Sequence, residues 1–198
     1  NMLDTNLKNQ LKTYLQNLKS PVELVVALDG SDKAAELKSL AEDIASLSSL
    51  IHLKDETDTA VLKPSMLVRS TAKNTQIRFA GVPMGHEFTS LVLALLHSGG
   101  HTIKEEASVL EQIAALPGSL NFEVYVSLSC QTCPEVVQAL NIMSAINPNI
   151  TNVMIDGAMF QDEVAAKNIM AVPSVYLNGE LFSQGAITLE KIIQKIDV

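Results

Sequence analysis

The sequence has little positive charge and no long apolar run. Its 198 residues carry 14 lysines and arginines against 22 aspartates and glutamates, which gives a formal net charge of −8. A nucleic acid or an anionic membrane surface would find no basic face on such a chain, so neither is expected as a partner. The longest apolar helical run, 91–96, is far shorter than the roughly 20 residues that cross a bilayer. A protein or a small molecule is left as the expected partner.

Charged residues of both signs are also few. They make up 18% of the chain, whereas hydrophobic residues make up 47%. Disordered chains show the opposite balance, so the composition indicates a globular protein that can bury a large core. The N-terminal residues lack the basic segment followed by an apolar one that marks a secretory signal. We therefore expect a cytoplasmic protein.

Cysteine occurs only twice, as Cys130 and Cys133. The pair stands between an apolar, β-rich run at 122–128 and a helical pattern at 133–146, which predicts strand, CxxC, helix. The first turn of a helix presents unpaired N–H groups and the positive end of the helix dipole, so this position favours a thiolate at Cys130. Pro134 suits the first turn, because a residue there has no intrahelical acceptor to lose.

The spacing of the two cysteines has other interpretations. A CxxC pair supplies two of the four ligands of a structural zinc site. The other two are missing, because there is no third cysteine and Gly99 and Gly100 should break the helix between His97 and His101. We therefore expect no metal. An inert buried pair, or a non-enzymatic docking module with incidental cysteines, stays open, but a CxxC between strand and helix in a cytoplasmic chain favours redox chemistry.

A proline loop follows the cysteines after about 40 residues. Val172, Pro173 and Ser174 precede a predicted strand and the Asn178-Gly179 turn. Thioredoxin-like folds place a cis-proline against the disulfide at this point of the chain. We therefore predict that Pro173 belongs to an active-site loop, although the sequence does not show its isomer.

The chain contains one pattern used twice. PVELVVALDGSDKAAELKSL aligns with NFEVYVSLSCQTCPEVVQAL, KPSMLV with VPSVYL, and RFAG with FSQG, so Pro64 corresponds to Pro173. The Ser-Gly-Gly stretch within 97–102 is the expected hinge between the halves. We predict an α/β protein with two tandem thioredoxin-like folds, 1–97 without cysteines and 98–198 with the redox centre, joined into one continuous sheet.

Each half is expected to hold the elements of a βαβαββα thioredoxin fold. The hydrophobic periodicity predicts helices at 3–18, 34–47, 87–96, 103–116, 133–146, 161–167 and 188–196, and strands at 22–28, 51–53, 66–69, 77–80, 122–128, 153–156, 174–177 and 180–183.

Three segments together resemble a known family. VSLSCQTCPEVVQALNIM, VPSVYLNG and RFAGVPMGHEFTSLVLALL are similar to the N-terminal domain of the alkyl hydroperoxide reductase AhpF, and the resemblance covers 2–198. It implies an electron relay from a flavoprotein disulfide centre to the disulfide of the peroxiredoxin subunit of alkyl hydroperoxide reductase, which destroys peroxides. It also implies that Glu87, in GHEF, is an acid/base near the dithiol. From the residues alone, Glu87 is only an acid at the start of a helix.

The chain has no GxGxxG dinucleotide fingerprint. The resemblance implies that FAD and NADH bind to further domains of the full-length protein, so no cofactor is expected in this chain. The expected catalytic residues are Cys130, which attacks the partner, Cys133, which resolves the mixed disulfide, and Glu87. A general thiol oxidoreductase of the glutaredoxin or protein disulfide isomerase kind, with many clients, is the alternative function.

Overall fold

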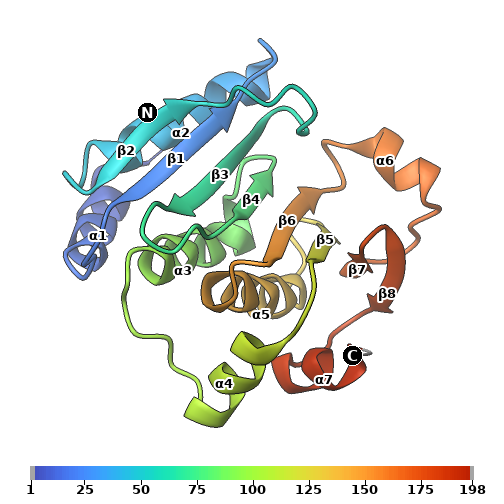
Figure 1. Cartoon of the computed structure of the whole chain (residues 1–198). Helices are drawn as coiled ribbons and strands as arrows, with labels where there is room; N and C mark the ends of the chain where they lie inside the picture. Colours follow the sequence, from blue (N-terminus) through green and yellow to red (C-terminus); the bar gives the residue numbers. More distant parts are fainter. Residues whose placement is uncertain (1–2, 197–198) are drawn as a thin grey trace.

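The computed structural model describes residues 3–196, which form one eight-stranded mixed sheet (Figure 1). The strands lie in the order β2-β1-β3-β4-β6-β5-β7-β8. Their bounds are β1 Val22–Ala27, β2 Ile51–Asp55, β3 Ser65–Ser70, β4 Ile77–Ala80, β5 Leu120–Val126, β6 Ile150–Asp156, β7 Ser174–Leu177 and β8 Glu180–Gln184.

The helices precede, connect or follow the strands along the chain. They are α1 Thr5–Leu15, α2 Asp32–Ala45, α3 Phe88–Ser98, α4 Ala107–Ala115, α5 Cys133–Ile146, α6 Gln161–Ala166 and α7 Leu189–Lys195, and a 3-10 turn, η1 Gly85–Glu87, precedes α3. Side chains of Asp4, Ser31 and Thr188 accept the orphan N–H groups at the starts of α1, α2 and α7. No helix within residues 3–196 is long and apolar enough to cross a membrane.

The two halves share the sheet through β4 and β6. These strands pair in parallel, from Ile77 opposite Asn152 to Ala80 opposite Ile155. Helices α3 and α5 pack against each other beside this seam (Figure 1). The predicted single sheet built from two tandem thioredoxin-like folds is therefore confirmed. The division between residues 97 and 98 stays a prediction.

The main core lies between the sheet and six of the helices. Alternate residues of β1, such as Val22, Leu24 and Val26, join buried side chains from α1 to α5 and α7 in one apolar cluster. A smaller cluster on the opposite face holds Tyr125 and Ile155, and α6 covers it. Both faces of the central strands are thus buried, which explains why they read as nearly continuous apolar runs.

The first half lacks the helix that the βαβαββα pattern places between β2 and β3, where the hydrophobic periodicity also predicted none. We expected both halves to hold every element of the βαβαββα fold, but residues 56–64 connect these strands without a helix, whereas α6 connects β6 to β7. The segment ETDTAVLKP has too few apolar residues for a helical stripe, and Pro64 ends it. The expectation of a complete fold in the first half was therefore wrong.

Charged side chains cover the sheet face that this missing helix leaves open. Arg69 donates from Nε and Nη2 to Glu23 Oε1 at 2.9 and 2.7 Å, and Lys54 pairs with the other oxygen of Glu23. Arg78 donates to Glu56 Oε2 at 2.9 Å. The hydrogen bonds from Lys54 and Arg69 lower the pKa of the Glu23 carboxyl. An ion-pair layer thus takes the place of a helix on this face.

Candidate active site

The redox pair lies where β5 ends and α5 begins. β5 stops at Val126, two residues before the predicted end at 128, and a short loop follows. α5 starts at Cys133, as the sequence predicted. Cys130 and Cys133 form a disulfide, with their Cα atoms 5.5 Å apart. The Cys130 N–H donates to the Ser127 carbonyl at 3.1 Å, which turns the loop toward the helix.

The two sulfurs differ in their access to solvent. Cys133 is fully buried, whereas Cys130 is half-buried at the surface of the loop. Only Cys130 is therefore within reach of another protein. This difference matches the order of attack and resolution that the sequence suggested, although the roles themselves stay predictions.

Two donors surround the Cys130 sulfur. The Cys133 backbone N–H donates to Cys130 Sγ at 3.2 Å, and Thr132 Oγ1 lies 3.5 Å from the same sulfur. The backbone donor belongs to the first turn of α5, so the predicted position at a helix N-terminus is confirmed. Donors at this distance favour an anionic sulfur over a neutral thiol.

A segment of the first half reaches across the seam to this loop. The His86 N–H donates to the Leu128 carbonyl at 3.0 Å, two residues before Cys130. Gly85 makes this approach possible, because its φ is +58° and a Cβ there would lie 2.9 Å from the Leu128 carbonyl oxygen. The 3-10 turn that carries Glu87 is thereby held against the active-site loop.

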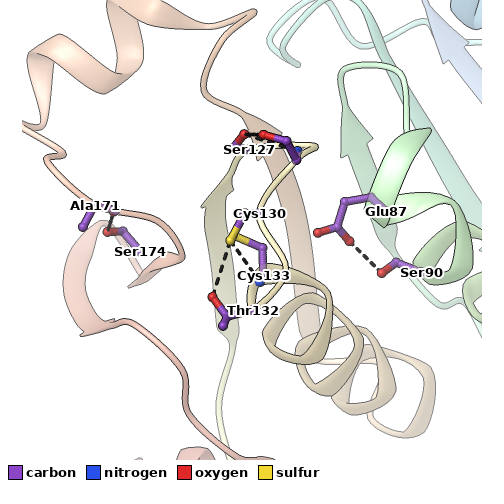
Figure 2. Close-up of a disulfide and its surroundings, with 9 residues drawn as sticks. Glu87, Ser90, Ser127, Cys130, Thr132, Cys133, Ala171 and Ser174 are labelled. Atoms are coloured by element: carbon purple, nitrogen blue, oxygen red, sulfur yellow. Dashed lines mark hydrogen bonds between the residues drawn. A yellow bond between two sulfur atoms is a disulfide. The ribbon is translucent and has the colours of Figure 1, made fainter.

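Glu87 is fully buried beside the redox pair. Figure 2 shows its carboxyl group pointing from the first half toward the disulfide. Ser90 Oγ donates to Glu87 Oε1 at 2.7 Å, and Gln138 of α5 donates to Ser90 Oγ at 3.1 Å. Oε2 has no hydrogen-bond partner among the described residues. Burial raises the pKa of Glu87 to about 7, against a smaller lowering by the Ser90 hydrogen bond.

The proline loop lies on the other side of the disulfide. Figure 2 places Ala171 and Ser174, which flank it, across Cys130 from Glu87. The Val172–Pro173 peptide is cis, and so is Lys63–Pro64 at the equivalent point of the first half. The Gly185 N–H donates to the Pro173 carbonyl at 2.8 Å, and Ser174 Oγ donates to the Ala171 carbonyl at 2.7 Å. These bonds hold the loop in place.

The structure therefore brings together all four residues that the sequence singled out, Cys130, Cys133, Glu87 and Pro173. It adds three polar residues that sequence reasoning missed. Ser90 stands one helical turn after Glu87, a spacing that pointed to contact, but nothing in the sequence linked Gln138 or Thr132 to the site. No group of three or more His, Cys, Asp or Glu side chains within residues 3–196 is placed to hold a metal ion.

Comparison with known protein sequences identifies relatives that match this chain over nearly its whole length. The thioredoxin domain family matches residues 120–197, which include both cysteines. The alkyl hydroperoxide reductase AhpF of Pseudomonas putida is 57% identical over 197 residues, covering 99% of this chain and 38% of that protein. The Escherichia coli protein of the same name is 54% identical over 196 residues, with the same two shares. The chain thus spans less than half the length of these relatives.

Solved structures share the whole fold. The N-terminal domain of AhpF from Enterococcus faecalis superposes with a TM-score of 0.88 at 32% identity, covering 98% of this chain and 100% of that one. A protein disulfide oxidoreductase from Aeropyrum pernix has a TM-score of 0.81 at 21% identity, covering 96% of this chain and 90% of that one, which shows the fold alone. The chain therefore belongs to the family of the N-terminal domain of the alkyl hydroperoxide reductase AhpF, a dithiol–disulfide oxidoreductase domain with a thioredoxin fold.

Proposed function

We propose that this chain is an electron relay, which takes electrons from the disulfide centre of a flavoprotein and reduces the disulfide of a peroxiredoxin, the peroxide-destroying subunit of alkyl hydroperoxide reductase. The observation that carries the proposal is one redox disulfide with one accessible and one buried sulfur, next to a buried carboxyl from the cysteine-free half. The names of the relatives support the choice of partner. FAD and NADH belong to further domains of the full-length protein.

The reaction begins at Cys130. In the reduced protein its thiolate attacks one sulfur of the partner's disulfide, the partner's S–S bond breaks, and a new bond joins Cys130 to the partner. The Cys133 thiolate then attacks Cys130 Sγ, and the bond between Cys130 and the partner breaks. The partner sulfur that was bonded to Cys130 leaves as a thiolate. Two electrons have moved to the partner, whose two thiolates take up protons, and the Cys130–Cys133 disulfide remains. Electrons from the flavoprotein reverse this change.

Glu87 handles the proton of the resolving step. Cys133 is fully buried, so its proton needs a nearby acceptor before the sulfur can attack. A carboxyl with a pKa of about 7 is partly ionised near neutral pH, and its unpartnered Oε2 is free to accept that proton and pass it to a departing thiolate. Ser90 and Gln138 position the carboxyl through its other oxygen.

The Pro173 loop receives the partner's chain. No hydrogen-bond partner within residues 3–196 meets the backbone N–H or C=O of Val172, although the backbone on either side is bonded. They belong to the loop whose flanking residues, Ala171 and Ser174, lie on the side of Cys130 away from Glu87 in Figure 2. The two groups suit an extended segment, which would pair with them as an added strand does. The disulfide of the partner is thereby brought to the accessible sulfur.

Single cysteine variants test the relay. The prereduced chain is mixed with oxidised peroxiredoxin, and the products are followed on non-reducing gels and by mass spectrometry. Cys133→Ser should accumulate a mixed disulfide between Cys130 and the peroxiredoxin, whereas Cys130→Ser should give neither a mixed disulfide nor reduced partner. The reverse pattern would contradict the assigned roles. Equally fast reduction of insulin and of the peroxiredoxin would instead indicate a general oxidoreductase.

A further inference from the structure

Thr132 occupies the N-cap position of α5 but does not cap the helix. A threonine there usually accepts the N–H of the third helical residue, as Thr188 Oγ1 accepts from Lys191 at 3.3 Å in α7. Thr132 makes no such bond. Its backbone is already helical, with φ −92° and ψ −15°, whereas Thr188 is extended with ψ 160°. The hydroxyl is therefore not used to stabilise the helix start.

The hydroxyl faces the Cys130 sulfur instead, as the dashed line in Figure 2 shows. Thr132 Oγ1 lies 3.5 Å from Cys130 Sγ, within the range of a hydrogen bond to sulfur, and the Cys133 N–H approaches the same sulfur at 3.2 Å. A disulfide sulfur is a weak acceptor, whereas a thiolate is a strong one. Reduction of the disulfide therefore strengthens both contacts.

We propose that Thr132 is a positioning residue of the redox centre, whose hydroxyl donates to the Cys130 thiolate and favours the ionised, reactive form of the attacking thiol. This inference rests on the proposed function for the role of Cys130. The proposal gives the Thr132 side chain a role in stabilising the Cys130 thiolate. This role is separate from that of the backbone N–H groups, which every helix start supplies. The proposal also predicts that the reduced form is favoured, because adding two electrons and one proton to the disulfide breaks the S–S bond and leaves a Cys133 thiol and a stabilised Cys130 thiolate.

The size of the effect is set by one partly exposed hydrogen bond. Such a bond shifts the pKa of the thiol by roughly half a unit to one unit. Thr132→Val keeps the shape of the side chain and removes the hydroxyl, so the Cys130 pKa should rise by that amount. Thr132→Ser keeps the hydroxyl and should keep the pKa of the parent protein.

The titration is best measured on a single thiol. All variants are made with Cys133→Ala, which leaves Cys130 as the sole thiol and retains the backbone N–H at 133. The rate of alkylation by iodoacetamide is recorded against pH for the parent, Thr132→Val and Thr132→Ser. Ser129→Ala is the matched control, because the Ser129 hydroxyl lies beside Ser127 at 3.0 Å and not beside the sulfur. Thermal unfolding of each variant shows whether the helix start has changed.

A raised Cys130 pKa in Thr132→Val, restored in Thr132→Ser and absent in Ser129→Ala, supports the proposal. An unchanged pKa in Thr132→Val overturns it, as does a serine variant that behaves like valine or an equal shift in Ser129→Ala. With both cysteines present, the valine variant should also be less reduced than the parent in the same dithiothreitol buffer. No partner takes part in these measurements, so their outcome is separate from any failure of electron transfer to the peroxiredoxin.

Discussion

Glu87→Gln removes an ionisable group from a position that is fully shielded from water. The substitution keeps the shape of the side chain and its hydrogen bond with Ser90, but it has no proton to release. The variant therefore isolates the free energy of placing a charge beside the disulfide. The experiment uses the oxidised protein, in which neither cysteine titrates.

The direction of the effect follows from the raised pKa. Burial raises the pKa of Glu87 from 4.5 to about 7 in the folded chain. Below pH 4.5 the carboxyl is protonated in both states, and its full contribution to stability is present. As pH rises toward 7, the unfolded chain releases the proton while the folded chain retains it, so stability is lost until the folded group also ionises. At about 1.4 kcal/mol per pKa unit, the total loss is about 3 kcal/mol.

Urea unfolding at a series of pH values measures this loss. The free energy of unfolding of Glu87→Gln minus that of the parent should increase by about 3 kcal/mol from about pH 4 to about pH 8, while other titrating groups cancel in the difference. A difference that does not change with pH would refute the reasoning, because Glu87 would then ionise as readily in the folded as in the unfolded chain.

Glu23→Gln is the control of opposite sign. The folded-state pKa of Glu23 is lowered by its bonds to Lys54 and Arg69, so its contribution to stability is present above the unfolded value of 4.5 and is lost as pH falls through the folded value. The variant should be less stable than the parent at neutral pH and equal to it in acid. Since Lys54 and Arg69 are partly exposed, solvent screening limits the neutral-pH loss to about 1–2 kcal/mol.

Further predictions concern the site and its electron supply. Gly85→Ala should destabilise the protein by about 1–3 kcal/mol more than Gly118→Ala in urea unfolding, because both have positive φ but only Gly85 faces a carbonyl oxygen; equal losses would contradict the close approach. Glu87→Gln should lower the Cys130 pKa in alkylation assays and slow release of the mixed disulfide near neutral pH, whereas unchanged values would leave Glu87 without a catalytic role. The pure chain should show no flavin absorbance and oxidise no NADH until a reductase and a peroxiredoxin are added, and NADH oxidation by the chain alone would contradict this prediction.

The repeated pattern predicted most of the fold, because strand and helix periods are local properties of the sequence. The apolar run at 22–28 and the helical pattern at 34–47 predicted β1 and α2, and the equivalent segment with Cys130 predicted β5 and α5. The ends of elements were less predictable. The helix expected at 103–116 begins only at Ala107, since Glu106 is extended with ψ 143°. The apolar Ile103 packs against the core from a loop instead.

The composite character of the site could not be derived from local pattern. Periodicity placed Glu87 at the start of a helix, and only the family resemblance placed it near the thiols. Its actual position depends on the parallel pairing of β4 with β6 and on Gly85 approaching the Leu128 carbonyl. Both are long-range contacts, so they are absent from any window of sequence. Gln138 was unpredictable for the same reason, because it meets Ser90 across the seam.

The ion-pair layer on the first half implies that the sheet is protected against local unfolding in two different ways, by ion pairs in the first half and by apolar packing in the second. Apolar cover under α6 is insensitive to ionic strength, whereas the pairs around Glu23 weaken in salt because Lys54 and Arg69 are partly exposed. The Arg78–Glu56 pair is largely buried and is screened less. Backbone amides of β1 and β3 should therefore exchange with deuterium faster at high salt, while those of β5 and β7 keep their rates. The first half, which supplies the Glu87 carboxyl, is then the half whose local opening depends on the salt concentration.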